Sequence, residues 1–133
     1  MTRRANADFY EKRLLGVELP RLRQHVDGGP NAKPVSIHHV YHQYVIRHAR
    51  RNDLSDALRD AGIETQIHYP IPVHRQPAYA DLEYSKGCLP VTERIADEVL
   101  SLPINPGLTI SDLTAVANAI AAFTANEESR NAA

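Results

Sequence analysis

The feature that most restricts this chain is a proline-dense stretch, "QIHYPIPVHRQPAY", which runs from residue 66 to residue 79. Each proline fixes a backbone φ angle and removes a backbone N–H donor, so the stretch can form neither a regular helix nor a central strand. The prolines also restrict the residues before them, among them Tyr69 and Ile71. Because apolar side chains alternate with the prolines, we expect a rigid loop that is partly buried.

The same stretch carries imidazole and phenol groups. These belong to His68, Tyr69, His74 and Tyr79. A loop already ordered by prolines loses little conformational entropy when its side chains bind a ligand, which favours a pre-organised binding surface. The alternative is a rigid connector whose tyrosines cover the edges of neighbouring helices. The spacing of the residues leaves both interpretations open.

Hydrophobic periodicity predicts helices and short strands on both sides of this loop. The expected helices cover residues 3–15, residues 54–61 with a cap at Asn52 or Asp53, residues 91–100 with Ile95, Val99 and Leu102 as their apolar stripe, and a last helix capped by Ser111. The expected strands cover residues 39–48, residues 63–68 and an edge strand within residues 101–106. This order predicts one α+β domain over residues 1–133, with a small, three-stranded, antiparallel sheet covered by helices and a frayed tail at 124–133.

The composition excludes several functional classes. Hydrophobic residues make up 43% and charged residues 23% of the 133, and the net charge of −1 gives no reason to expect nucleic acid or a membrane as partner. The local basic cluster, Arg47–Arg51, is expected to be a solvated turn. No segment approaches the length of a membrane span, and the N-terminal segment lacks the apolar region of a signal peptide. A single cysteine allows no intrachain disulfide, and we expect a cytoplasmic protein.

Seven histidines raise the question of a metal site, and three of them, His38, His39 and His42, lie close together. On a strand, His38 and His42 point to one side and His39 to the other, so they do not converge as zinc requires. His42 shares its face with Tyr44 and Ile46, and we expect it to be a hydrogen-bonded core histidine. With one cysteine in the chain, a cysteine-based zinc site is also excluded, and no metal site is predicted.

The sequence offers no catalytic residue either. It contains no G-x-S-x-G nucleophile motif, and Cys88 follows Gly87 in an expected surface turn, where we expect it to be chemically idle. Gly28 and Gly29 precede Pro30, which cannot donate a backbone N–H to a phosphate, so no phosphate-binding loop is predicted.

Three segments resemble one protein family in their order and spacing. They are "VYHQYVIR" (40–47), "GIETQIHYPIPVHRQPAY" (62–79) and "LPVTERIADEVLSLPINPGLT" (89–109). Over residues 5–123 the chain looks like the C-terminal small domain of the DegT/DnrJ/EryC1/StrS aminotransferases, which are pyridoxal-phosphate enzymes that aminate nucleotide-linked keto-sugars. The H-Y-P-x-P-x-H-x-Q-P-A-Y form looks most like members that act on dTDP-linked 3-keto-6-deoxyhexoses.

The resemblance implies a fold-type I architecture, in which this small domain closes over a cleft in a large domain, within a homodimer. Residues 1–16 then form the linking helix, whose apolar residues are expected to be partly exposed when the large domain is absent. His68, Tyr69 and His74 match the loop that borders the cleft, which implies that they are substrate-binding. Tyr69 and His68 are expected to contact the sugar or phosphates and His74 to support the loop. Gln66 and Ile67 stand where members often carry a smaller residue.

The transaminase reaction needs a lysine that forms a Schiff base with pyridoxal phosphate and a carboxylate at its pyridinium nitrogen. In the family both lie in the large domain, and none of Lys12, Lys33 and Lys86 stands in the lysine motif. We therefore expect that this chain alone binds no pyridoxal phosphate and is inactive. It would need a large-domain partner, encoded upstream in the same gene or on a separate polypeptide. The alternative functions are a non-catalytic nucleotide-sugar-binding module, an inert gene remnant or, least favoured, a histidine-based metal hydrolase.

Overall fold

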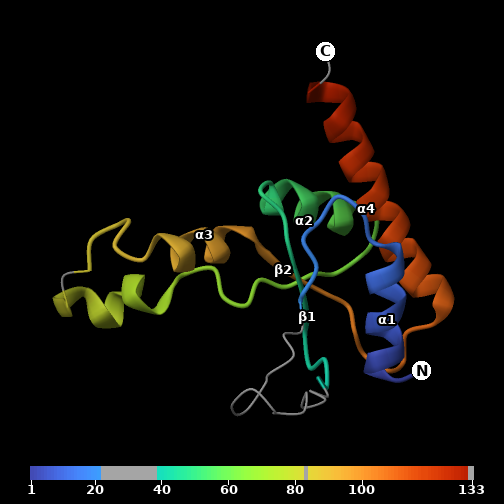
Figure 1. The fold of residues 1–133 in the computed structure, drawn as a ribbon, viewed down its shortest axis with the longest axis horizontal. Helices are drawn as coiled ribbons and strands as arrows, with labels where there is room; N and C mark the ends of the chain where they lie inside the picture. Colours follow the sequence, from blue (N-terminus) through green and yellow to red (C-terminus); the bar gives the residue numbers. More distant parts are fainter. Residues whose placement is uncertain (22–38, 83, 132–133) are drawn as a thin grey trace, which may run out of the picture.

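The computed structural model describes residues 1–21, 39–82 and 84–131 of the chain, and its elements confirm the α+β class (Figure 1). In chain order they are α1 (Arg3–Arg13), β1 (Tyr44–Arg47), α2 (Arg51–Asp60), the 3₁₀ turns η1 (Val73–Arg75) and η2 (Pro77–Leu82), α3 (Pro90–Glu98), β2 (Val99–Leu102) and α4 (Ile110–Asn131). Residues 22–38 lie outside the described part, and with them Gly28, Gly29, Pro30, Lys33 and His38.

The sheet of named strands has two members, β1 and β2, which pair antiparallel with Tyr44 opposite Leu102 and Arg47 opposite Val99. The expected third strand at 63–68 makes a single antiparallel bridge, in which Gln66 and Ser101 exchange backbone hydrogen bonds of 3.2 and 2.7 Å. The prediction of three full strands is therefore not confirmed. The strand expected within residues 101–106 stops before Pro103, as proline requires, but it begins already at Val99. Its expected edge position was wrong, because β2 has β1 on one side and the Gln66 bridge on the other.

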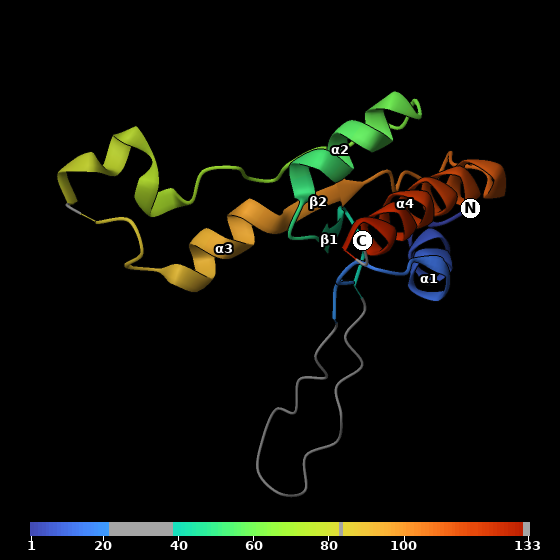
Figure 2. The same ribbon diagram turned by 90° about the horizontal axis from the view of Figure 1, so that it is seen from above.

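The core lies between the sheet and the helices, and its residues come from every long element except α3. The fully buried large side chains are Tyr10, Tyr44, Ile46, Leu54, Leu58, Leu100, Leu113 and Ile120, together with Asn6. Figures 1 and 2 show α1 alongside α4, and Ala7 and Tyr10 of α1 and Leu14 directly after it belong to this core. The expectation that α1 exposes its apolar stripe was thus wrong, because α4 of the same chain contributes to the core that covers it.

The strand predicted from residue 39 begins only at Tyr44, and this changes the position of His42. Tyr41 adopts a positive φ of 47°, which breaks the alternation of faces before the strand. Val40 and His42 are consequently exposed, so the prediction of a core histidine at 42 was wrong. Tyr41 is buried instead and donates its hydroxyl hydrogen to Glu11 Oε1 at 3.0 Å, and burial together with this contact raises the pKa of Tyr41 to about 12.

The helix ends also differ from those expected. Neither Asn52 nor Asp53 caps α2; the helix begins at Arg51, whose buried guanidinium donates to the carbonyls of Ala96 at 3.3 Å and Val99 at 2.9 Å. The basic cluster at 47–51 is therefore not a wholly solvated turn. Likewise α3 stops at Glu98 and gives way to β2, which buries Val99 and Leu102, while Ile95 remains 38% exposed.

At the start of α4 the cap is Thr109 rather than Ser111. The Thr109 hydroxyl oxygen accepts the backbone N–H of Asp112 at 3.2 Å, and Asp112 Oδ2 accepts the backbone N–H and the hydroxyl of Thr109, each at 2.8 Å. This reciprocal arrangement is a capping box, which satisfies N–H groups that a helix start leaves without partners. Both hydrogen bonds from Thr109 hold the pKa of Asp112 below its usual range.

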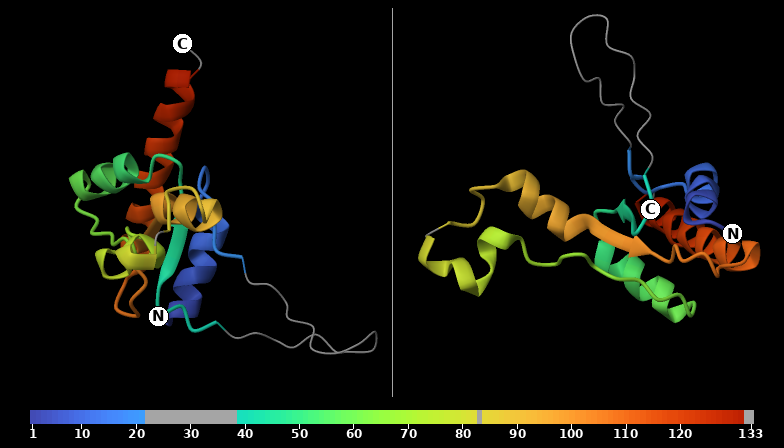
Figure 3. Two further views of the ribbon diagram at one scale, coloured as in Figure 1. Left: turned by 90° about the vertical axis from the view of Figure 1, so that its left-hand side faces the viewer. Right: turned by 90° about the horizontal axis from the view of Figure 1, so that it is seen from below.

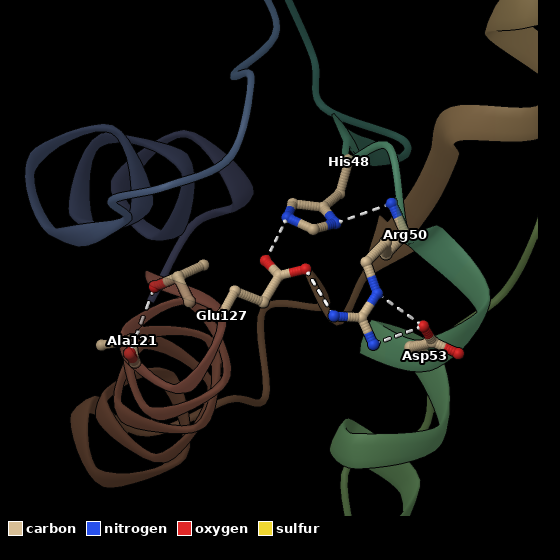
Figure 4. Close-up of polar contacts among 6 residues, drawn as sticks. His48, Arg50, Asp53, Ala121 and Glu127 are labelled. Atoms are coloured by element: carbon tan, nitrogen blue, oxygen red, sulfur yellow. Dashed lines mark hydrogen bonds and ion pairs between the residues drawn. The ribbon is translucent and has the colours of Figure 1, made fainter. Parts of the chain in front are cut away.

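The expected frayed tail at 124–133 was wrong in its start, since α4 continues to Asn131. Figure 4 shows why the helix is held there: Glu127 reaches the turn between β1 and α2. One carboxylate oxygen lies 3.0 Å from His48 Nε2, and the other accepts from Arg50 Nη1 at 3.1 Å. His48 Nδ1 in turn accepts the backbone N–H of Arg50 at 3.1 Å. Periodicity reports which residues share a helix face and could not reveal these distant partners.

The proline-dense stretch leads into a projection, residues 69–98, which we call the arm. Figures 1 and 3 show η1, η2 and α3 extending from the sheet toward the side opposite α1 and α4. Nine of the thirteen large hydrophobic side chains that are exposed among the described residues lie in the arm. The arm therefore presents apolar surface of a kind that proteins usually cover with a partner.

None of the described helices, including the long α4, combines the length and the apolar character that crossing a membrane requires.

Gly16 tests the contact between the end of α1 and α4. Gly16 and Gly62 both adopt positive φ angles, of 73° and 77°, but a Cβ at Gly16 would lie 2.6 Å from Thr124 Cγ2, whereas one at Gly62 meets nothing within 4 Å. We expect Gly62→Ala to lower the free energy of unfolding by about 1–2 kcal/mol because of its backbone conformation. Gly16→Ala should lower the free energy of unfolding by more than Gly62→Ala does, as measured by urea denaturation. Equal losses would contradict the close packing against Thr124.

The capping box predicts a pH dependence with a definite sign. Because the folded pKa of Asp112 is depressed, its contribution to stability is complete above the ordinary aspartate pKa, about 3.9, and is lost as the pH falls through the lower folded value. The difference in urea midpoint between wild type and Asp112→Asn should therefore be constant near neutral pH and shrink in acid. Asp60→Asn, at an exposed position ending α2, serves as the control. A difference independent of pH would contradict this assignment.

Candidate functional site

The three predicted substrate-binding residues lie in or beside the arm but face different surroundings. His68 stands where the arm begins, and its Nδ1 lies 2.9 Å from the hydroxyl of Ser101 in β2. Tyr69 is 72% exposed, and its ring meets the ring of His68 edge to face at 5.7 Å between centroids. His74 lies in η1, and only 6% of its side chain is exposed. His68 and Tyr69, which are consecutive in the chain, lie at the start of the arm, whereas the side chain of His74 is buried within the arm.

A cavity of about 590 Å³ opens beside His68. It is bordered by the residue pair 42–43, the segment 61–66, residues 101–104 and the first half of α4. The exposed His42 and the hydroxyl-bearing Ser101 belong to this lining, which combines apolar walls with a few polar groups. Such a lining suits a small molecule with a ring and polar substituents. Sequence reasoning missed this cavity, because it joins segments that are far apart in the chain.

Tyr69 does not border that cavity. It lines a separate hollow of about 350 Å³ with residues 70, 71 and 76–78. Its exposed hydroxyl can donate and accept hydrogen bonds, which suits a sugar hydroxyl or a phosphate oxygen. The chain therefore offers polar groups at the root of the arm without enclosing them in one closed pocket.

Within the arm, Glu93 of α3 contacts both η1 and the turn before α3. This residue was not identified from the sequence. Glu93 Oε1 lies 3.1 Å from His74 Nε2, and both carboxylate oxygens accept the backbone N–H of Gly87 at 2.9 Å. Gly87 has a φ of 91°, a conformation that favours glycine. The hydrogen bond from Gly87 and that from His74 hold the pKa of Glu93 below its usual value. In the sequence, Glu93 is recognisable only as an acidic residue in the first turn of a helix. That position does not reveal that it contacts His74 and Gly87.

The side chain of Cys88 lies beside those of His74 and Glu93. One donor atom each of His74, Cys88 and Glu93 lies within 4.8 Å of the other two. The expected surface turn at Cys88 is confirmed, since Cys88 is exposed. Its neighbours, however, are a histidine and a carboxylate, which the sequence did not place beside it.

The described residues do not fit pyridoxal phosphate. The cofactor needs a lysine for its Schiff base and donors for its phosphate. Lys12 and Lys86 are exposed, and Lys33 lies outside the described residues. Lys86 and Arg75 border a hollow of about 280 Å³, but Glu93 and Asp97 share it and offset their two positive charges, so it offers a phosphate no net attraction. No reaction step is therefore assigned to the cofactor in this chain.

The contacts of Glu93 predict that it holds η1 and the Gly87 turn against α3. Replacing it by glutamine removes the charged acceptor that serves both His74 and Gly87. We expect the amide of Gly87 in Glu93→Gln to exchange its hydrogen at least about tenfold faster, measured by NMR with a chelator present. Asp97→Asn, on the same helix, should leave that rate unchanged. If both variants behaved alike, Glu93 would have no special role in the arm.

Comparison with known proteins identifies relatives over most of the chain. Residues 1–121 match the DegT/DnrJ/EryC1/StrS aminotransferase family. A dTDP-3-amino-3,4,6-trideoxy-alpha-D-glucose transaminase from Micromonospora megalomicea subsp. nigra is 48% identical over 71 residues, which cover 53% of this chain and 19% of that protein. A UDP-N-acetyl-3-dehydro-alpha-D-glucosamine 3-aminotransferase from Acidithiobacillus ferrooxidans is 36% identical over 118 residues, which cover 89% of this chain and 29% of that protein.

The fold agrees with these relatives. The crystal structure of DesV from S. venezuelae, solved with a ketimine intermediate, matches with a TM-score of 0.75 and 36% identity, over 92% of this chain and 31% of that chain. The matched segments of this chain thus span between about a fifth and a third of the length of these relatives. Because the family match extends from residue 1 to residue 121, this chain belongs to the DegT/DnrJ/EryC1/StrS aminotransferase family.

Proposed function

We propose that this chain forms the lid and the substrate-side wall of the active site of a nucleotide-sugar aminotransferase. The observation that carries the proposal is the arm, which combines exposed apolar surface with His68 and Tyr69 at its root, in a chain that belongs to a sugar aminotransferase family. The apolar side chains of the arm are suited to contact the cofactor-bearing domain and a second subunit of a homodimer. The polar groups at its root are suited to contact the substrate.

The family depends on pyridoxal phosphate, which supplies the electron sink for transfer of the amino group. The described residues of this chain do not provide for the cofactor, so the large domain, located elsewhere, would hold it. The chain by itself is then inactive. Its contribution is to bind and orient the substrate and to exclude water when the lid closes over the cleft.

His68, Tyr69 and His74 each have a distinct role in this proposal. Ser101 holds the ring of His68 through Nδ1, so that the imidazole stands fixed at the arm root. Tyr69 offers its exposed hydroxyl to a sugar hydroxyl or a phosphate oxygen. His74 supports the loop through Glu93 instead of touching the substrate, because its side chain is buried.

The substrate class follows from the same site. Relatives named for dTDP-linked and for UDP-linked amino sugars share sequence with this chain, which favours a nucleoside-diphosphate-linked keto-sugar. Within that class we propose a dTDP-linked 3-keto-6-deoxyhexose, on the basis of the segment from His68 to Tyr79. A UDP-linked substrate is the competing assignment.

The test is a chimera in which this chain replaces the corresponding segment of a full-length relative. With pyridoxal phosphate and an amino donor, the chimera should transaminate the dTDP-linked keto-sugar, whereas the 133 residues alone should not. In the chimera, Tyr69→Phe combined with His68→Ala should raise KM for the sugar by at least about tenfold, because two contacts are lost. Tyr79→Phe, the same change farther along the arm, should leave KM unchanged.

Unaltered kcat and KM in the double variant would contradict the assignment of His68 and Tyr69. A folded chimera without any activity would favour the alternative function, a non-catalytic nucleotide-sugar-binding module or an inert remnant. Calorimetric titration of the isolated chain with the dTDP-sugar would separate those two, because a binding module would bind the sugar and an inert remnant would not.

A further inference from the structure

Three side chains of different elements meet inside the arm. His74 comes from η1, Cys88 from the turn before α3, and Glu93 from the first turn of α3. Their donor atoms lie within 4.8 Å of one another, and the side chains of His74 and Glu93 are only 6% and 17% exposed. Imidazole nitrogen, thiolate sulfur and carboxylate oxygen are the three kinds of ligand that zinc accepts in proteins.

The separation of two of these donors already suits a metal ion. His74 Nε2 and Glu93 Oε1 are 3.1 Å apart. Two ligands at about 2.0 Å from a tetrahedral zinc ion are about 3.3 Å apart, so an ion could take the place of the shared proton with little movement of either side chain. To complete the site, the thiol of Cys88 must move toward the ion. Cys88 is exposed, so its side chain has room to rotate.

The surroundings supply the support that metal ligands usually have. Ligating carboxylates are commonly hydrogen-bonded by neighbouring groups, which fix their orientation. Here the backbone N–H of Gly87 donates to both oxygens of Glu93 at 2.9 Å. The ring of Tyr84 packs edge to face on that of His74, with 6.0 Å between centroids. Both contacts come from the segment that joins η2 to α3.

We propose that His74, Cys88 and Glu93 bind a zinc ion, with water as the fourth ligand on the exposed side. The sulfur ligand favours zinc over magnesium or calcium, which take oxygen ligands. The ion would join η1 to α3 and close the loop of chain between residues 74 and 93, where apolar packing is sparse. The expectation that the chain has no metal site rested on His38, His39 and His42 and on the single cysteine, and the proposal departs from it because Cys88 meets a histidine and a carboxylate of other elements. It goes beyond the proposed function and does not depend on it.

The test uses the 133-residue chain, reduced and stripped of metal, titrated with Co²⁺ and then with Zn²⁺. One equivalent of Co²⁺ should produce a thiolate-to-cobalt charge-transfer band, and Zn²⁺ should remove it. Cys88→Ser should abolish the band, and His74→Ala and Glu93→Gln should each weaken Co²⁺ binding by more than about tenfold. His42→Ala, at an exposed histidine outside the arm, should leave the titration unchanged.

A second measurement needs no variant and so does not depend on whether a variant folds. Stoichiometric Zn²⁺ should slow alkylation of Cys88 in the wild-type chain, because a coordinated thiolate is protected. An unchanged alkylation rate, or the absence of the charge-transfer band, would overturn the proposal. So would an equal Co²⁺ affinity in wild type, His74→Ala and Glu93→Gln, since the exposed thiol alone would then explain binding. A ratio of one ion to two chains would place the metal between molecules and would overturn it as well.

Discussion

The pairing of Ser101 is the interaction on which the arrangement of this chain depends. Within β2, Ser101 lies opposite Val45 of β1 on one side and exchanges backbone hydrogen bonds with Gln66 on the other. Its hydroxyl also meets His68 Nδ1. One residue thus joins the helix-covered core to the start of the arm. This attachment sets the direction in which the proline-dense stretch leaves the domain, because the prolines that follow restrict the backbone torsion angles.

The core and the arm are stabilised by different kinds of interaction. The core buries aliphatic and aromatic side chains from α1, α2, α4 and the sheet, as expected of a small domain that depends on the hydrophobic effect. The arm exposes most of its large apolar side chains and is held internally by the polar contacts of Glu93. A segment of this kind has low intrinsic stability and gains order when a partner covers it. This property suits a lid better than a rigid scaffold.

Among the described residues, polar groups occur without the setting that the cofactor needs. Aminotransferase chemistry belongs to the cofactor and its lysine, and the part of the chain that the structure describes fits neither. What it offers is a cavity beside His68, the exposed hydroxyl of Tyr69 and apolar surface beyond them. The proposed role in substrate binding rests on these features. The cluster of His74, Cys88 and Glu93 lies within the arm and consists of other residues.

The sequence by itself determined the α+β class, the family, the existence of the four α-helices that the described residues form and the interruption at the proline-dense stretch. These features depend on local periodicity and on the fixed geometry of proline, which neighbouring residues already contain. The tertiary structure alone decided that His42 is exposed, that His74 is buried against Glu93, that Ser101 stands between two partners and that Glu127 holds the end of α4. Each of these outcomes needs residues that are distant in the chain to meet. Periodicity assigns a side chain to a face of its own element but does not specify which other element covers that face.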